Sequence, residues 1–339
     1  MIKKENAIWG AIPDPEDSRD FIYEDFIAGK ARPVGMPTLA QGYDAEDIFG
    51  KLRDEHQDSS YRCVAEGGTS DNEMSILAIT KRMIQLSQRD AYSQIFQSGG
   101  GASPRDFYKL ANGKGICEDR FCPSYPADGS EVTEAFSRQR GDITTKRTEN
   151  AKQWRIGAYR SITSLNLEVI AQAIFENNGC GGAYRPINNS MGHMIWFKGY
   201  GIHKGYQGLK YRDSYPPYEK WIVKHKGKFY YSSTNQPLAT EIQLYSIWTA
   251  EPGDWLKKKL MIQLKRATNE KKVFAIIGEK KYWINSWDNL EDFLELFGYD
   301  NLEKAKNSVI EVSPEHLEQF DYAGNIGNPS IWDYIFGRK

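Results

Sequence analysis

The sequence lacks the features that would mark a membrane, secreted or zinc-stabilised protein. It has no run of about 18 apolar residues, so no segment is expected to span a membrane. It has no C-x-x-C pair and only five histidines, so a structural zinc site is not expected. Its start, MIKKENAIWGAIPDPEDSRD, shows a short basic patch without an apolar core behind it. No secretory signal is therefore visible, and we expect the protein in the cytoplasm after synthesis.

An excess of charge of one sign is also missing. Lys and Arg number 44 against 45 Asp and Glu, which gives a net charge of −1 at pH 7. Nucleic acids and acidic membranes attract proteins through a positive field, so neither is an expected partner. What the chain has is length and apolar content: 339 residues, 40% of them hydrophobic. That is ample for a sizeable core and predicts two domains, or one domain with an appendage.

The four cysteines are expected to be free thiols: Cys63, Cys117, Cys122 and Cys180. Cys117 and Cys122 are close enough in sequence to form a bridge, but without a secretory signal a disulfide is disfavoured. Taken alone, Cys63 would most often be a small buried hydrophobic residue. A chemical role for it therefore needs support from other parts of the chain.

The character of the sequence changes along the chain. Residues 1–55 are rich in Pro, Gly and Asp and predict an irregular arm. Helical spacing and capping signals then recur at 72–88, 104–113 and 166–179. Asn166 is the expected N-cap of the last of these helices, and Gly179 its terminator. Aromatic and β-branched strands follow at 193–202, 220–231 and 243–250. Helices first and antiparallel strands second predict an α+β fold.

A further change of character near residue 253 predicts a small appended module. DWLKKKLMIQLKRA (254–267) has the pattern of a basic amphipathic helix, and KVFAIIGEKKYWI (272–284) that of a hairpin turning at Gly278-Glu279. Two short helices are expected after it, at 289–298 and 301–306. The predicted organisation is an arm over 1–55, a main domain over 56–252 and a helix-hairpin-helix module of unknown role over 253–339.

Residues from separate parts of the sequence could together support chemistry at the Cys63 thiol. Cys63 is expected at the start of a helix, where the helix dipole favours a thiolate. His193 opens the apolar strand in GHMIWFKGYG and is a candidate base. Asp213, in LKYRDSYPP, could orient that imidazole, or it could only form a turn at a strand end. Gln57, six residues before Cys63, could donate to an oxyanion, or it could be a solvated loop residue.

In this order these residues resemble papain-like cysteine peptidases, especially a divergent, unprocessed branch from bacteria and bacteriophages. The resemblance covers roughly residues 10–255 and rests on the Gln57–Cys63 spacing and on the segments PDPEDSRDF, LSQRDAYSQIFQSGGGASPRDFYKLANGKGICEDRFCPSYP, LEVIAQAIFENNG, GHMIWFKGYG, YRDSY and LYSIWTAEPGD. It implies a two-subdomain fold with a helical N-terminal half and an antiparallel β C-terminal half. It also implies Cys63 as nucleophile, His193 as general base and acid, Asp213 as orienter and Gln57 as oxyanion donor.

The same resemblance implies the substrate and its position. A cysteine endopeptidase or amidase of this kind needs no metal and no organic cofactor. Its substrate would be an extended peptide, from a protein or from peptidoglycan, lying in a cleft between the two halves. The residues expected to border that cleft are Gly99, Gly100, Gly101, Gly192 and Tyr215.

Departures from the family pattern leave a second interpretation open. Asp58, Tyr61 and Arg62 stand where the family usually has Gly, Gly and Ser, and Tyr61 and Arg62 are bulky where a substrate backbone would approach. The alternative is therefore a catalytically impaired fold that serves as a structural or interaction protein, such as a bacteriophage virion component with a partner bound through 253–339. A literal Asn-Ser-Trp at 285–287 lies too far beyond His193 to replace Asp213, and we expect it to cap a helix.

Overall fold

The computed structural model describes residues 9–253 and, beyond them, five strands at 263–267, 273–277, 280–284, 310–312 and 321–326. The chain divides into two compact units, Met1–Gly253 and Asp254–Lys339. In the described residues no helix is both long enough and apolar enough to cross a lipid bilayer.

The first unit begins with helices and ends with strands. Its helices are α1 (Tyr23–Ile27), α2 (Ala45–Phe49), α3 (Cys63–Thr80), α4 (Gln88–Ile95), α5 (Pro104–Gly113), the 3₁₀ helix η2 (Asp119–Phe121), α6 (Glu134–Arg138), α7 (Thr145–Gln153) and α8 (Leu167–Asn177). Its strands are β1 (Tyr43–Asp44), β2 (Ile156–Ile162), β3 (Cys180–Pro186), β4 (His193–His203), β5 (Tyr206–Arg212), β6 (Glu219–His225), β7 (Lys228–Ser232) and β8 (Thr240–Pro252). The expected α+β order is confirmed.

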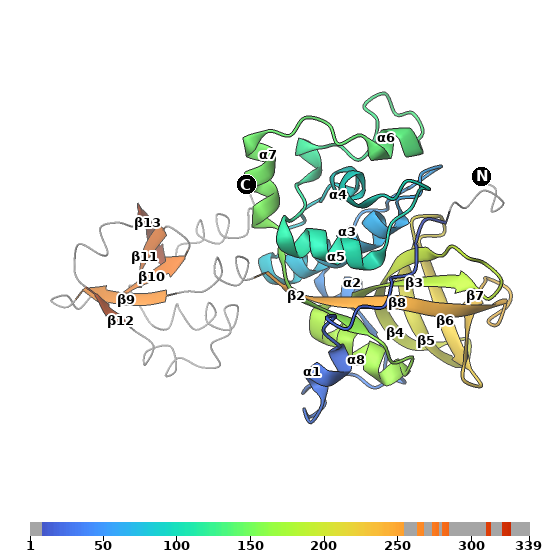
Figure 1. Ribbon diagram of the computed structural model, residues 1–339. Coiled ribbons are helices and arrows are strands. Elements are labelled where there is room, and N and C mark those ends of the chain that lie inside the picture. Colours follow the sequence, from blue (N-terminus) through green and yellow to red (C-terminus); the bar gives the residue numbers. More distant parts are fainter. Residues whose placement is uncertain are drawn as a thin grey trace. The chain divides into compact units, whose positions relative to one another are not determined.

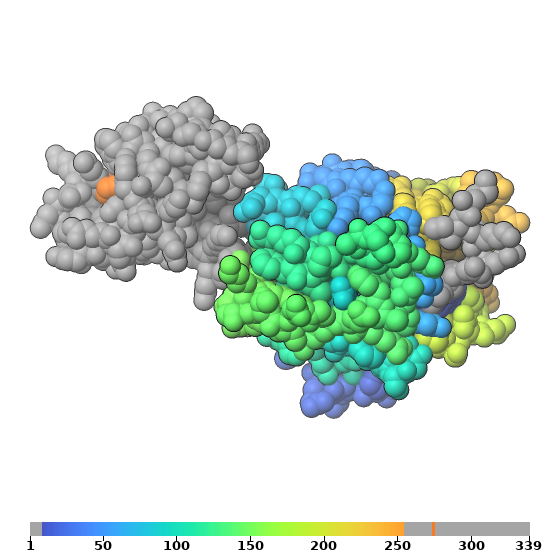
Figure 2. Space-filling view, turned by 90° about the horizontal axis from the view of Figure 1, so that it is seen from above, coloured from blue at the N-terminus to red at the C-terminus, as the bar shows by residue number. Residues whose placement is uncertain are grey.

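The strands of this unit form one antiparallel sheet that closes on itself. Its order is β1-β4-β3-β8-β7-β6-β5, with β2 beside β8. Because β5 pairs with β4 as well as with β6, the strands from β3 to β8 make a closed barrel. Figure 1 shows α3 to α7 on one side of the long strand β8, and α1 and α8 on the other. In the view from above, residues of about 100–150, in teal and green, cover much of the face (Figure 2).

Two glycines let the central helix α3 lie close to its neighbours. A Cβ on Gly68 would lie 2.4 Å from the Phe107 ring on α5, and one on Gly67 would lie 3.0 Å from the Ile195 carbonyl carbon on β4. Each glycine costs a helix about 1 kcal/mol relative to alanine. That loss is offset here by burial, since every residue of α3 from Cys63 to Leu77 is buried.

The helix expected over 72–88 is correct only as far as Thr80, because residues 81–87 are not helical and α4 begins at Gln88. α3 ends where Lys81 takes the left-handed conformation, with φ 54°. The Glu73 carboxylate on α3 accepts a hydrogen bond from the Leu86 backbone N–H at 2.6 Å, which turns the returning chain back along the helix. Ser87 then caps α4 with its hydroxyl oxygen. Helical periodicity alone cannot predict this hydrogen bond between Glu73 and Leu86, which lie 13 residues apart.

Of the other two expected helices, the one at 166–179 has its expected capping bond, whereas Ser103 precedes α5 without making one. α5 begins at Pro104, directly after Ser103, and ends at Gly113. In α8 the Asn166 side chain accepts a hydrogen bond from the Glu168 N–H at 3.0 Å. α8 ends at a left-handed asparagine, Asn178, one residue before the expected terminator.

Removing the cap of α8 should weaken the fold measurably. We expect Asn166→Ala to lower the free energy of unfolding by about 1 kcal/mol, because the Glu168 N–H loses its acceptor. Asn166→Asp keeps an acceptor oxygen and should change the stability by less. Denaturant unfolding followed by circular dichroism compares the two variants, and equal losses would show that the cap contributes nothing.

The second unit contains a five-stranded sheet. Its strands are β9 (Gln263–Ala267), β10 (Val273–Ile277), β11 (Lys280–Ile284), β12 (Ile310–Val312) and β13 (Asp321–Ile326), in the order β12-β9-β10-β11-β13. β10 and β11 pair antiparallel with Ile277 opposite Lys280, which confirms the expected hairpin. Its turn, Gly278-Glu279, lies outside the described residues.

The basic helix expected over 254–267 is wrong for its last five residues. Residues 263–267 form β9, which pairs with β10 on one side and β12 on the other, and these pairings override the helical pattern. Residues 254–262 lie outside the described residues. So do the Asn-Ser-Trp at 285–287 and the two helices expected at 289–298 and 301–306.

Candidate active site

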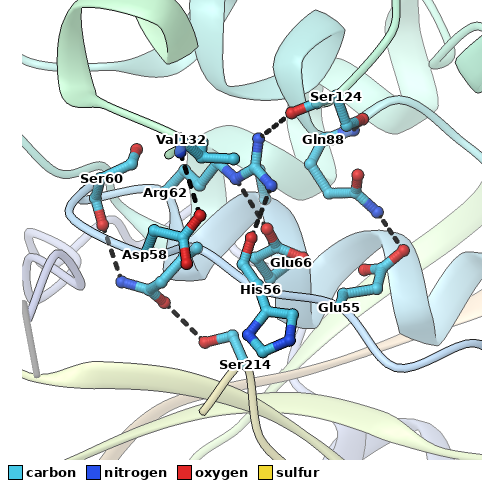
Figure 3. A network of polar contacts seen from close by, with 12 residues as sticks. Glu55, His56, Asp58, Ser60, Arg62, Glu66, Gln88, Ser124, Val132 and Ser214 are labelled. Atoms are coloured by element: carbon cyan, nitrogen blue, oxygen red, sulfur yellow. Dashed lines mark hydrogen bonds and ion pairs between the residues drawn. The ribbon is translucent and has the colours of Figure 1, made fainter. Parts of the chain in front are cut away.

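Cys63 is the first residue of α3, as expected, and its side chain is fully buried. The N–H groups of a first helical turn have no partners within the helix and favour an anion there. The preceding Arg62 does not face a substrate, which corrects the expectation from its size. Its buried guanidinium donates to Glu66 Oε1 at 2.7 Å, Ser124 O at 2.6 Å and His56 O at 2.8 Å (Figure 3). Arg62 therefore fastens the start of the helix.

His193, the first residue of β4, lies between a carboxylate and the thiol. Its Nε2 is 2.9 Å from Asp213 Oδ1. The Cys63 side chain also contributes, after Asp213, to the raised pKa of this imidazole. Within residues 9–253, the other ring nitrogen, Nδ1, is buried and has no hydrogen-bond partner. The fold thus brings together three side chains that lie 150 residues apart in the sequence, from Cys63 to Asp213.

The charges of this site reinforce one another. Burial disfavours the imidazolium, but the charge and hydrogen bond of Asp213, together with Cys63, outweigh it and raise the pKa of His193 from 6.5 to about 9. Burial likewise opposes ionisation of Asp213. The charges and hydrogen bonds of His193 and Lys220 nevertheless lower the pKa of Asp213 to about 2. Between these two values both groups are charged, and they form a buried ion pair.

Asp213 is held by a short loop after β5. Its N–H donates to Tyr218 O at 2.8 Å, and its Oδ1 also accepts from the Tyr215 N–H at 3.0 Å. The other oxygen, Oδ2, accepts from Lys220 Nζ at 2.6 Å. Lys220 lies on β6, and no pattern in the sequence indicated that it would contact the site. Only the pairing of β5 with β6 brings it to the carboxylate.

Gln57 is fully buried and fixed at both ends of its amide, so it is not a solvated loop residue. Its Nε2 donates to Ser60 O at 2.8 Å, and its Oε1 accepts from Ser214 Oγ at 2.6 Å. Figure 3 shows Ser60 at the left edge and Ser214 at the lower edge of the network of polar contacts before α3. Because Ser214 directly follows Asp213, its bond to Gln57 connects the segment before α3 to the loop that holds the Asp213 carboxylate.

Two tyrosine rings enclose the imidazole. The ring of Tyr215, expected to border a substrate, lies 5.9 Å from the His193 ring, and its hydroxyl donates to Asp58 O at 2.9 Å. The Tyr184 ring meets the imidazole edge-on at 5.8 Å. Tyr184 stands opposite His193 in the pairing of β3 with β4, a placement that the sequence did not predict.

Residues 10–14 of the N-terminal region, called the arm from here on, pass between the helical half and the barrel, beside His193. Ala11 and Gly192 exchange two backbone hydrogen bonds: Ala11 N–H donates to Gly192 O at 2.8 Å, and Gly192 N–H donates to Ala11 O at 3.0 Å. On the helical side, Ile12 N–H donates to Ala102 O at 2.9 Å, and Ala102 N–H donates to Gly10 O at 2.8 Å. The arm is thus an extended peptide that is hydrogen bonded along both edges.

A single carboxylate fastens this arm to both halves. Asp14 Oδ1 accepts from the Ser103 hydroxyl and from the Arg105 N–H, the latter at 3.0 Å, at the start of α5. Asp14 Oδ2 accepts from Trp248 Nε1 on β8 at 2.7 Å. Since α5 belongs to the helical half and β8 to the barrel, displacement of the arm must break contacts to both.

The glycine-rich loop borders the arm, although its role differs from the expected one. The backbone hydrogen bonds come from Ala102, which the sequence did not single out, and not from Gly99, Gly100 or Gly101. A Cβ on Gly101 would lie 2.3 Å from Gly10 O, so the glycine allows the close approach of the two backbones. Gly100 and Gly101 also have φ angles of 91° and 79°, which favour glycine.

The arm leaves the candidate site closed. The exposed fraction is 0% for Cys63 and 3% for His193. Gly10 of the arm lies against the backbone two residues before the thiol, where a Cβ would come within 1.9 Å of Tyr61 O. Gly192, which pairs with the arm, directly precedes the histidine. The arm therefore lies beside the backbone that precedes each of the two buried residues.

The other thiols are structural, and no disulfide forms, since all four cysteines are free. Burial raises the pKa of Cys117, Cys122 and Cys180, which disfavours the reactive thiolate at each. In the described part of the chain, no group of three or more His, Cys, Asp or Glu side chains is arranged to hold a metal ion.

No family model and no curated protein matches the sequence. Solved structures match the fold at low identity. Xylellain, a cysteine protease from Xylella fastidiosa, is 17% identical with a TM-score of 0.50, over 73% of this chain and 97% of that one. ProCathepsin B S9 from Trypanosoma congolense is 12% identical with a TM-score of 0.52, over 73% of this chain and 86% of that one. The chain therefore has the α+β fold of the papain-like cysteine proteases, as its sequence led us to expect.

Proposed function

We propose that this chain is a cysteine endopeptidase or amidase that cleaves an extended peptide through a thioacyl intermediate on Cys63. The observation that carries this proposal is the His193 imidazole, which is held by Asp213 and acted on by Cys63 at a helix start. The arm supports it further, because an extended peptide already lies along both halves beside this site.

The proposed reaction uses a Cys63 thiolate together with a His193 imidazolium. The Cys63 thiolate attacks the substrate carbonyl carbon and forms a C–S bond, while the carbonyl oxygen becomes an oxyanion. The Cys63 N–H and the Gln57 amide donate to that oxyanion, and Ser60 and Ser214 hold the amide plane in place. The His193 imidazolium gives its proton to the departing amine as the C–N bond breaks. Water then attacks the thioester, His193 takes a proton from it, and the acid product leaves the regenerated thiolate.

The arm suggests how a substrate binds and how the enzyme is kept inactive. A substrate would take the place of residues 10–12 and pair with Gly192 on one side and Ala102 on the other. While the arm stays there, Cys63 is out of reach of a peptide. We therefore infer that activity requires the arm to leave.

Hydrolysis should be tested on the full chain with its arm displaced by Gly10→Ala, a variant argued in the Discussion. An unstructured protein and peptidoglycan stem peptides are the two substrates, and mass spectrometry of new chain ends identifies the bonds that are cut. Cleavage of one substrate class and not the other decides between a peptidase and a peptidoglycan amidase. Intact substrates of both kinds, with an alkylatable Cys63, would contradict the proposed activity.

The pH dependence of kcat/KM should show an alkaline limit set by His193. The raised pKa keeps the imidazolium charged up to about pH 9. Above that value the thiolate loses its counter-ion and the leaving amine its proton donor, so activity should fall about tenfold per pH unit. Asp213→Asn removes the carboxylate that raises this pKa and should move the limit to lower pH. A limit that stays in place would show that another group controls it.

A second candidate is a protein that uses this fold for binding without catalysis, and the complete burial of Cys63 favours it. Once the arm is displaced the two candidates differ, because a reactive thiolate is alkylated near pH 6 whereas an inert thiol reacts at the rate of a denatured one. A place in a phage particle and a partner bound through 253–339 stay predictions.

A further inference from the structure

The Asp213 carboxylate, which orients His193, also forms an ion pair with a buried lysine, Lys220. Lys220 Nζ lies 2.6 Å from Asp213 Oδ2, and the side chains of Lys220 and Asp213 are only 10% and 3% exposed. The same ammonium donates to Tyr215 O at 3.0 Å, in the loop that connects the two residues. Each oxygen of the carboxylate thus has its own cation, with the imidazolium on Oδ1 and the ammonium on Oδ2.

The second cation matters because a carboxylate can orient an imidazole without its full negative charge acting on the ring. A buried carboxylate beside an imidazolium stabilises it strongly, which makes it a weaker acid toward the departing amine. An ammonium on the far oxygen draws part of that charge away from the ring. It also prevents rotation of the carboxylate, because both oxygens are engaged.

We propose that Lys220 is a positioning residue of this site: its ammonium offsets part of the charge of Asp213 and fixes the carboxylate plane, so that less of that charge acts on His193 than an unpaired carboxylate would supply. The inference rests on the proposed function of the site. It differs from that function in assigning a role to the charge of a side chain that touches neither the imidazole nor a substrate.

The other groups that face this ion pair do not replace the lysine. Among the described residues, the rings of Tyr184 and Tyr215 lie against His193, and the charge of Asp213 acts on the phenols of Tyr184, Tyr211 and Tyr231. Burial raises the pKa of Tyr184, Tyr211 and Tyr231 above the usual value, so these phenols stay neutral at physiological pH. Lys220 is thus the cation that meets Asp213 opposite the imidazole.

The test is the titration of His193 by NMR in the full chain, with Cys63→Ala as background so that no thiolate contributes. Five histidines make the selectively labelled spectrum simple to assign. Lys220→Met should raise the pKa of His193 by about one unit, because the whole carboxylate charge then acts on the ring. In an Asp213→Asn background the same substitution should shift it by less than about 0.3 unit, because no carboxylate charge remains to be offset.

Controls separate this effect from general damage to the strand. Lys224→Met, on the same strand β6, removes an ammonium that donates to Leu165 O and should leave the His193 titration unchanged. Lys220→Arg keeps the charge and should restore the parent titration. If Lys220→Met does not fold, Lys220→Gln removes the charge and keeps a donor for Asp213, and carries the same expectation.

Hydrolysis gives a reciprocal readout in the chain with an intact Cys63 and a displaced arm. Asp213→Asn alone leaves the Lys220 ammonium buried without its counter-ion, so the double variant Asp213→Asn/Lys220→Met should hydrolyse peptide about tenfold faster than Asp213→Asn. An unchanged His193 titration in Lys220→Met, or an equal shift with Asn at 213, would overturn the role of Lys220. Because the NMR titration needs no turnover, that result stands apart from failure of the proposed peptidase activity.

Discussion

Cys63→Ala is expected to abolish peptide hydrolysis in a chain whose arm has been displaced, lowering kcat/KM by on the order of 10⁴- to 10⁶-fold. The sulfur forms the bond to the substrate carbon, and alanine offers no atom for that step. The His193–Asp213 pair and the Gln57 amide stay in place, but they have no nucleophile to assist. Initial rates of cleavage of an unstructured polypeptide, followed by mass spectrometry, measure the loss.

The control for this substitution is Cys122→Ala. Cys122 is also buried, and burial raises the pKa of its thiol, but it lies away from His193, after η2. It should keep the parent activity. Circular dichroism and thermal unfolding should give similar results for both variants, so that a loss confined to Cys63→Ala reflects chemistry. Hydrolysis that survives Cys63→Ala would remove the thiol from the mechanism altogether.

Local signals in the sequence were sufficient for the elements that carry the site. A cysteine at a helix start and a histidine opening an apolar strand depend on short-range patterns, and both residues lie where they were expected. The cap at Asn166 was read from a single residue in the same way. Patterns of this kind survive folding because the contacts that satisfy them lie within a few residues.

The parts that could not be predicted depend on contacts between distant strands and loops. Lys220 reaches Asp213 only because β6 pairs with β5, and Ala102 reaches the arm only because residues about 90 positions earlier fold back over it. The size of Arg62 indicated a side chain facing a substrate, but the partners that draw it inward lie at Ser124 and His56. A buried charge is recognisable only once its partners are placed.

Gly10→Ala is expected to open the site, because a Cβ at this position would lie 1.9 Å from the Tyr61 carbonyl oxygen. That oxygen belongs to the backbone directly before α3 and has little room to move, so the arm must shift. Alkylation of Cys63 by iodoacetamide near pH 6, followed by mass spectrometry of the labelled peptide, should become about 100-fold faster, which corresponds to a weakening of the closed state by about 3 kcal/mol. Gly113→Ala makes the same chemical change where no atom lies within 4 Å apart from the neighbouring residues of its own helix, and it should leave the rate unchanged.

Asp14→Ala tests the same closure by a different contact. It removes an acceptor shared by the Ser103 hydroxyl, the Arg105 N–H and the Trp248 indole, and hydrogen bonds to a charged group contribute about 1.5–3 kcal/mol each. Accelerated alkylation in both variants, with hydrolysis appearing alongside it, would identify the arm as the element that keeps the enzyme inactive. If Cys63 reacts at the parent rate in both, the arm does not control access to the thiol, and its burial must come from the packing of the two halves themselves.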